Sequence, residues 1–216
     1  MTEKKGLSAL DVLKSGPVIP VIVVSNPDHA VPLARALLVG GIKVLEITLR
    51  SDAALESIRR IRLEVPDAIV GAGTVLSGQD LHAVAEAGGR FAISPGLTPK
   101  LLKAAEKEAI PLIPGVASAS ELMLALEAGL TELKFFPAQA AGGVQMLKSF
   151  HGPFPQVSFC PTGGVTLQNY KEYLSLKNVA CVGGSWLVPS EKIAQEDWSA
   201  ITVLAQEAVA GASSSL

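Results

Sequence analysis

The chain has 216 residues, of which 49% are hydrophobic and 18% are charged, and its formal net charge is −2. This length suits one domain or at most two small ones, and the small negative charge provides no basic field to attract nucleic acid. No apolar run reaches the roughly 18 residues that a membrane-spanning helix needs, so the high hydrophobic share indicates strands buried on both faces.

The amino terminus predicts a cytoplasmic location. Its charged residues are not followed by an apolar signal core, so nothing in it predicts export. In a reducing compartment the two cysteines, Cys160 and Cys181, are expected to be small buried side chains.

Residues 7–15 predict a helix ahead of the first strand, in a place where it can plug the floor of a barrel.

A βα unit repeats along the chain. Apolar, β-branched runs recur about every 20 to 25 residues, and each is followed by a helical pattern. The eight predicted strands cover residues 18–24, 43–50, 68–74, 91–94, 111–114, 132–136, 157–162 and 179–184. Helices are expected between them, for example over residues 28–39, 52–65, 79–87 and 118–128.

Eight alternations without a linker predict an α/β fold, a single (β/α)8 TIM barrel over residues 1–216 with residues 211–216 as a frayed tail. A doubly wound open sheet is the structural alternative. Several predicted strands end in a turn that contains proline, at Pro95, Pro114, Pro137 and Pro161. Proline cannot donate within a central ladder, so these turns mark the carboxyl edge, where barrels carry their active sites.

Lys134 lies in the middle of the predicted sixth strand among apolar neighbours. An ammonium group there loses its hydration, which is costly unless the group is paired or loses its proton. A lysine without that proton is an amine nucleophile that can form a Schiff base with a carbonyl substrate. The alternative interpretation is a lysine that extends from an edge strand with its head in water.

The predicted second strand supports the nucleophile. Its period of two places Glu46, Thr48 and Arg50 on one face, and in a barrel that face points inward because the apolar face meets the helices. The second and sixth strands lie opposite each other in a barrel whose interior is only wide enough for side chains. We therefore expect Glu46 to meet Lys134, which places a proton-shuttling carboxylate beside the amine.

Two glycine pairs follow the last two predicted strands and favour a phosphate site. Gly163 and Gly164 end the seventh strand, and Gly183 and Gly184, followed by Ser185, end the eighth. Glycine lets backbone N–H groups approach an anion, and the loops after these two strands recurrently bind phosphate in this fold. No His, Asp and Glu grouping has metal-ligand spacing, and no nucleotide-binding fingerprint is present.

Nearly the whole chain resembles the 2-keto-3-deoxy-6-phosphogluconate (KDPG) aldolases, many of which also cleave 4-hydroxy-2-oxoglutarate (KHG). The most specific stretches are residues 44–50, 71–74, 94–96, 134–138 and 159–164, which read VLEITLR, GAGT, SPG, KFFPA and FCPTGG. The resemblance implies a class I aldolase without a metal or another cofactor, assembled as a homotrimer. Its products would be pyruvate with glyceraldehyde 3-phosphate, or pyruvate with glyoxylate.

The resemblance also implies a role for each matched residue. Lys134 matches the Schiff-base lysine and Glu46 the general acid and base, whereas the presence of Thr162 favours the gluconate over the galactonate stereoisomer. Residues that match substrate-contacting positions are Arg50, Thr74, Pro95, Phe136 and Thr162. Residues that match the phosphate loops are Gly163, Gly164, Gly184 and Ser185.

Other functions remain open from the residues alone. A phosphate-binding barrel isomerase or epimerase would use Glu46 as a base and Lys134 only as its electrostatic partner. A non-catalytic sugar-phosphate-binding barrel would bind its ligand without turnover, and a metal-dependent aldolase would need a ligand cluster. Reduction by borohydride in the presence of pyruvate separates these alternatives from a Schiff-base enzyme.

Overall fold

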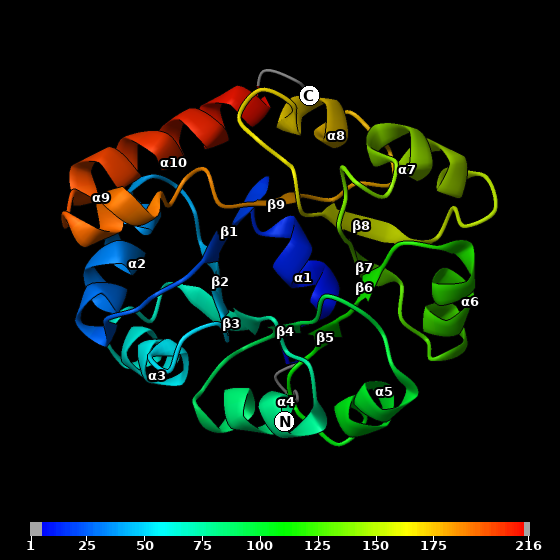
Figure 1. Ribbon diagram of the computed structural model, residues 1–216, viewed down its shortest axis with the longest axis horizontal. Coiled ribbons are helices and arrows are strands. Elements are labelled where there is room, and N and C mark those ends of the chain that lie inside the picture. Colours follow the sequence, from blue (N-terminus) through cyan, green and yellow to red (C-terminus); the bar gives the residue numbers. More distant parts are fainter. Residues whose placement is uncertain (1–5, 214–216) are drawn as a thin grey trace, which may run out of the picture.

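The structure is a computed structural model that describes residues 6–213, and its strands form a closed parallel barrel ringed by helices (Figure 1). The strands are β1 Val18–Ile22, β2 Val44–Thr48, β3 Ile69–Gly73, β4 Ala92–Ile93, β5 Leu112–Ile113, β6 Gly115–Val116, β7 Glu132–Phe135, β8 Ser158–Pro161 and β9 Val182–Gly184. The helices are α1 Ala9–Lys14, η1 Pro27–His29, α2 Ala30–Val39, α3 Ala54–Glu64, α4 Gly78–Glu86, α5 Pro99–Ala105, α6 Ala119–Glu127, α7 Gly143–His151, α8 Tyr170–Leu174, α9 Ser190–Ala194 and α10 Trp198–Ser213.

The barrel closes through one interrupted strand and two isolated bridges. One run of paired strands has the order β5-β4-β3-β2-β1-β9, and the other has the order β6-β7-β8. Only Pro114 separates β5 from β6, because proline has no N–H to donate and interrupts the fifth strand of the barrel. Parallel bridges between Phe159 and Val179 and between Thr162 and Gly183 join β8 to β9. The predicted (β/α)8 barrel is confirmed.

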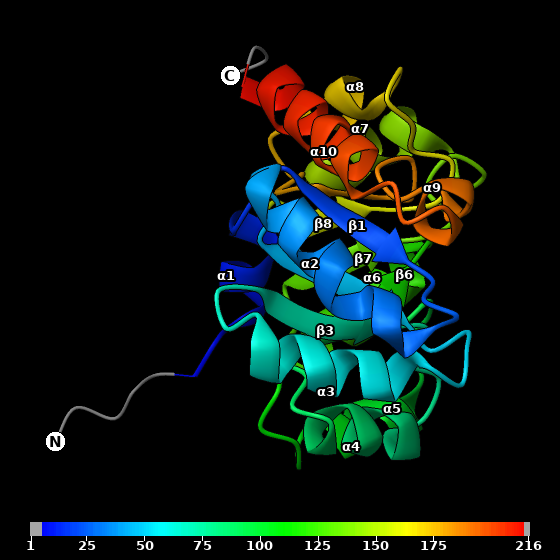
Figure 2. The same cartoon turned by 90° about the vertical axis from the view of Figure 1, so that its left-hand side faces the viewer.

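Helix α1 covers the amino-terminal end of the barrel, as predicted. It begins with a reciprocal capping box, in which Ser8 and Asp11 each accept a hydrogen bond from the other's backbone N–H at 3.1 and 3.0 Å. Figure 1 looks in from the carboxyl ends of the strands and shows α1 behind the centre of the ring, and Figure 2 shows it at the opposite end from that mouth.

Two hydrophobic cores result from this arrangement. The interior core fills the lower half of the barrel, where α1 meets the inward side chains of the strands, and consists of Val12, Leu13, Ile19, Val44, Phe91, Ile93, Ile113, Cys160 and Cys181. The larger outer core lies between the strands and the surrounding helices. The amino-terminal half of the barrel interior is therefore filled by apolar side chains, which leaves the carboxyl end for a substrate.

The chain's carboxyl end corrects one expectation. Residues 211–213 were expected in a frayed tail, but they continue α10 to Ser213 because this helix packs on its neighbours. Ala212 is buried there, and the Tyr170 hydroxyl donates to the carbonyl of Ala208 at 3.2 Å. Residues 214–216 of the expected tail, and residues 1–5 on which the expectation about export depends, lie outside the described residues. No helix among residues 6–213 is long and apolar enough to cross a membrane.

Candidate active site

Lys134 and Glu46 meet inside the barrel, as the strand positions predicted. The Lys134 Nζ lies 3.3 Å from the Glu46 Oε1, and the two side chains are only 5% and 2% exposed. Lys134 comes from the middle of β7 and Glu46 from the middle of β2, where both side chains alternate inward. The pair is therefore an amine and a carboxylate within proton-transfer distance, held almost free of water.

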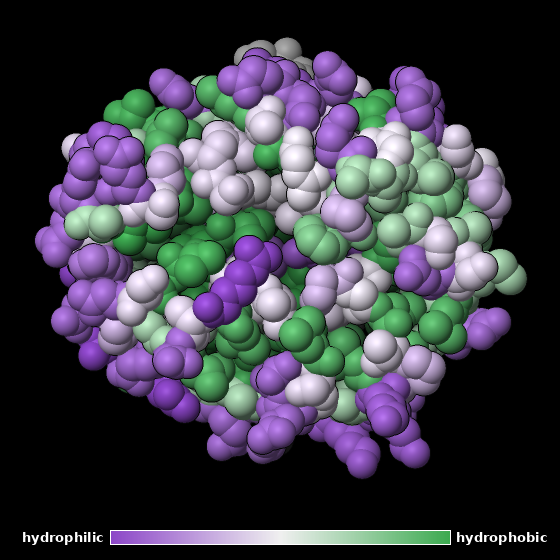
Figure 3. All heavy atoms as spheres, viewed as in Figure 1, coloured by the Kyte–Doolittle hydropathy of each residue, from purple (hydrophilic) through white to green (hydrophobic). Residues whose placement is uncertain are grey.

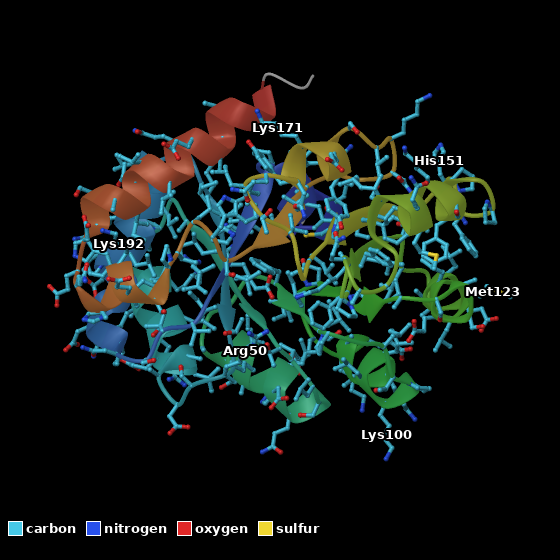
Figure 4. All side chains as sticks on the ribbon, turned by 45° about the horizontal axis from the view of Figure 1, so that its top comes forward. Arg50, Lys100, Met123, His151, Lys171 and Lys192 are labelled. Atoms are coloured by element: carbon cyan, nitrogen blue, oxygen red, sulfur yellow. The ribbon has the colours of Figure 1, made fainter. Side chains whose placement is uncertain are left out.

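Above this pair, two further predicted residues lie toward the mouth. The half-buried ring of Phe136 has its centroid 5.2 Å from the Lys134 Nζ, which is within the range of a cation–π contact. Arg50 is exposed, and its Nε donates to the Thr74 Oγ1 at 3.2 Å. Figure 4 shows Arg50 over the barrel mouth, whereas Lys100 lies on the outer ring of helices.

Thr74 has an unusual backbone. Its φ of 59° lies in the left-handed region, which a β-branched residue rarely adopts and which costs about 1 to 3 kcal/mol. Such strain persists mainly where the surrounding structure requires it, as at binding and catalytic sites. Here it accompanies a hydroxyl that holds the guanidinium of Arg50.

A cavity of about 540 Å³ opens at the mouth beside Arg50. Its lining contains seven of the predicted site residues, namely Arg50, Phe136, Thr162, Gly163, Gly164, Gly184 and Ser185. Figure 3 shows this face hollowed near its centre, with apolar side chains gathered around the hollow, and the valines of the lining are Val21, Val23, Val165 and Val188. The two predicted phosphate loops therefore share one cavity.

Four predicted site residues are not part of that lining. Lys134 and Glu46 lie deeper, and the Phe136 ring connects them to the cavity because it both lines the cavity and contacts Lys134. Thr74 joins the site through Arg50. Pro95 is half-buried at the end of β4, and no described contact links its side chain to Lys134 or to the cavity.

Two glycines prove necessary for the site: Gly73, which sequence reasoning did not select, and Gly183, which it selected only as part of a phosphate loop. A Cβ atom at Gly73 would overlap the carboxylate of Glu46, and a Cβ atom at Gly183 would overlap the Oγ1 of Thr162. The sequence shows only a glycine within each strand, whereas the register that brings Gly73 beside Glu46 and Gly183 beside Thr162 comes from the structure.

The thiols of Cys160 and Cys181 form the floor beneath the site. Both are buried and unbridged, and the Cys160 Sγ lies 3.9 Å from the Thr162 Oγ1. A hydrogen bond with Cys160, together with complete burial, raises the pKa of the Cys181 thiol well above its usual range. Cys181 is thus a neutral side chain at ordinary pH, as expected from the sequence. Among residues 6–213, no three His, Cys, Asp or Glu side chains group as they would around a metal ion.

Comparison with known proteins identifies the family. The family model described as KDPG and KHG aldolase matches residues 10–204. The chain belongs to the KDPG and KHG aldolase family. It is therefore an aldolase, a lyase that cleaves carbon–carbon bonds, and the family predicted from its motifs is confirmed.

Known members of the family match along nearly their whole length. The KHG/KDPG aldolase of Escherichia coli strain K12 is 59% identical over 205 residues, which cover 95% of this chain and 96% of that protein. A Legionella pneumophila KDPG aldolase crystal structure, with pyruvate captured as a covalent carbinolamine, has a TM-score of 0.92 at 54% identity and covers 93% of this chain and 98% of that one. A Zymomonas mobilis ZM4 2-keto-3-deoxy-6-phosphogluconate aldolase with 3-phosphoglycerate has a TM-score of 0.89 at 48% identity, with coverages of 94% and 95%.

Proposed function

We propose that this chain cleaves 2-keto-3-deoxy-6-phosphogluconate to pyruvate and glyceraldehyde 3-phosphate through a Schiff base on Lys134. The observation that carries the proposal is the buried contact of 3.3 Å between the Lys134 Nζ and the Glu46 Oε1 at the base of an open cavity. Relatives named as KHG/KDPG aldolases support a second substrate, 4-hydroxy-2-oxoglutarate, which would give pyruvate and glyoxylate.

The first half of the reaction builds the Schiff base. Transfer of one proton from Lys134 to Glu46 leaves a neutral amine beside a carboxylic acid. The amine attacks the C2 ketone to form a carbinolamine, and Glu46 returns a proton to the hydroxyl that departs as water. The product is an iminium ion, covalently attached to Lys134. This sequence agrees with the carbinolamine described for the Legionella pneumophila enzyme.

The second half breaks the carbon–carbon bond. Glu46, now a carboxylate, takes the proton of the C4 hydroxyl, and the electron pair of the C3–C4 bond moves toward the iminium. The aldehyde leaves, and an enamine of pyruvate remains on Lys134. Protonation at C3 restores an iminium, which water hydrolyses to pyruvate and the free amine.

The other predicted residues bind the two ends of the substrate. Arg50 offers a planar guanidinium suited to a carboxylate, and among residues 6–213 it has no acidic partner within ion-pair distance. Its Nε already binds Thr74, which orients the group. Thr162, Pro95 and Phe136 would surround the pyruvyl unit. The phosphate would bind to the backbone around Gly163, Gly164 and Gly184 and to the hydroxyl of Ser185, all of which line one cavity.

Trapping of pyruvate tests the covalent step. Treatment with pyruvate and borohydride should reduce the Schiff base to a stable adduct on Lys134, which peptide mass mapping locates. The Lys134→Met variant should lose both the adduct and the cleavage activity, because no amine remains at that position. The Lys43→Met variant is the matched control, since Lys43 is exposed where β2 begins and should not affect trapping. An adduct on another lysine, or none, would disprove the mechanism.

We also infer that the protein assembles as a homotrimer and works in the cytoplasm. The trimer is supported by the resemblance to the family, and the location by the two buried cysteines, Cys160 and Cys181, which form no disulfide.

A further inference from the structure

The loop after β8 anchors three consecutive peptide groups by their carbonyl oxygens. The carbonyl oxygens of Thr162 and Gly163 accept hydrogen bonds from the backbone N–H groups of Ala138 and Gln139, at 2.8 and 2.9 Å. The carbonyl oxygen of Gly164 accepts from the side-chain Nδ2 of Asn169 at 3.0 Å. All three carbonyl groups are therefore anchored to residues that do not line the cavity.

Anchored carbonyl groups determine where the N–H groups point. In a planar trans peptide the N–H and the C=O point in opposite directions, so these bonds direct the N–H groups of Gly163, Gly164 and Val165 away from their anchors. The same three residues line the cavity. None of these N–H groups has a hydrogen-bond acceptor within residues 6–213. The loop thus offers three N–H donors without acceptors to an anion in the cavity.

Asn169 is the one side chain among these anchors. It stands immediately before α8, where asparagine commonly caps a helix, but its side chain makes no cap bond to α8. Instead its Oδ1 accepts from the N–H of Thr166 at 2.8 Å while its Nδ2 donates to Gly164. A backbone N–H can only donate and a carbonyl can only accept, so these two partners define the orientation of the amide. Figure 1 shows this chain segment running from the mouth outward to α8.

The loop needs such an anchor because its two glycines can adopt many backbone conformations. Gly163 and Gly164 have φ values of 96° and 77°, and glycine readily adopts other conformations. Without the bond from Asn169, the peptide between Gly164 and Val165 is free to rotate and to turn the N–H of Val165 away from the cavity. The first two peptides keep their backbone anchors in that case.

We propose that Asn169 is a positioning residue that sets the affinity of the enzyme for the phosphate end of its substrate. The proposal rests on the proposed function, because it assumes that the cavity holds the phosphate. Asn169 acts only through the loop, so it should discriminate between phosphorylated and unphosphorylated substrates. It should leave the chemistry at Lys134 unchanged.

The Asn169→Ala variant tests this with two substrates. The KM for 2-keto-3-deoxy-6-phosphogluconate should rise about tenfold with kcat nearly unchanged, because one hydrogen bond to a charged group is lost. The KM for 4-hydroxy-2-oxoglutarate, which has no phosphate, should not change. In the aldol direction, kcat/KM for the addition of pyruvate to glyceraldehyde 3-phosphate should fall, whereas kcat/KM for the addition to glyceraldehyde should not change. The isosteric Asn169→Asp variant keeps the acceptor for the N–H of Thr166 but loses the donor to Gly164. Its KM should also rise for the phosphorylated substrate and stay unchanged for 4-hydroxy-2-oxoglutarate.

Asn178→Ala is the matched control. The Nδ2 of Asn178 also donates to a backbone carbonyl, that of Leu147 at 2.9 Å, but neither residue lines the cavity. This variant should lower thermal stability without a difference between the two substrates. Equal effects of Asn169→Ala on both substrates, or no effect on either, would overturn the proposal. A failure to trap pyruvate on Lys134 of the unsubstituted protein would instead disprove the proposed function.

Discussion

The carboxylate of Glu46 occupies the space that a side chain at position 73 would need. β2 and β3 pair in parallel with Thr48 opposite Gly73, so the inward face of β3 lies directly beside Glu46. Only glycine leaves room for the carboxylate to reach the Lys134 Nζ at 3.3 Å. Gly73 is therefore as necessary to the proposed proton transfer as the two ionisable residues, although it carries no functional group.

This relation predicts the effect of Gly73→Ala. The added methyl group should displace the carboxylate of Glu46, and kcat should fall about 100-fold because small displacements of a reacting group are costly. The double variant Gly73→Ala with Glu46→Asp should recover part of the loss, since the shorter side chain leaves room for the methyl group. Steady-state kinetics on both variants measure the effect.

Gly40→Ala is the steric control for this experiment. Its Cβ would meet the Cβ of Ala205, where α2 packs against α10 on the outside of the barrel. It should lower the thermal midpoint and leave kcat unchanged. A Gly73→Ala enzyme with unaltered kcat would contradict the assigned role.

At the scale of elements, α1 closes the amino-terminal end of the barrel. The inward side chains of the strands leave an apolar surface at the amino-terminal end, and α1 covers it with Val12 and Leu13, both fully buried. The site then has a dry floor, which includes Cys160 and Cys181. A short helix of six residues gains most of its stability from this packing and from its capping box.

Leu13→Ala should reduce the free energy of unfolding by about 2 to 5 kcal/mol, because it leaves a cavity in the interior core. KM should not change, since α1 lies at the end of the barrel opposite to the site. Urea unfolding gives the energy, with Leu63→Ala as the control because Leu63 is 81% exposed. An equal loss of unfolding free energy in both variants would show that α1 does not support the core.

At the scale of the whole molecule, closure of the barrel brings residues from most of the chain to one end. The contact between Glu46 on β2 and Lys134 on β7 depends on both runs of strands and on the bridges that join β8 to β9. Glu46 and Lys134 contact each other within one chain. We therefore expect each subunit to hold its own catalytic pair.

The proposed trimer can be measured directly. Light scattering after gel filtration should give three times the chain mass of 22.4 kDa, whereas a monomer or dimer would contradict the proposal. Dilution until the trimer dissociates should leave trapping of pyruvate on Lys134 intact, because Glu46 comes from the same subunit.

The sequence by itself predicted the barrel and the family, which are confirmed, and it also predicted the site residues, because local patterns indicated each of them. A period of two placed Glu46 and Arg50 on one face, an isolated lysine in an apolar strand indicated Lys134, and paired glycines indicated the phosphate loops. The exact strand ends were less predictable, as at Pro114, where the fifth strand divides into β5 and β6.

Only the tertiary structure decided how these residues contact one another. No local pattern could show that Gly73 makes space for Glu46, that Asn169 anchors Gly164 and leaves α8 uncapped, or that α10 continues to Ser213. The first and the third depend on atoms that are distant in the sequence or on packing against a neighbouring element, and the second depends on the conformation of the loop between β8 and α8. Periodicity specifies the face on which a side chain lies, but closure of the barrel decides which side chain it meets there.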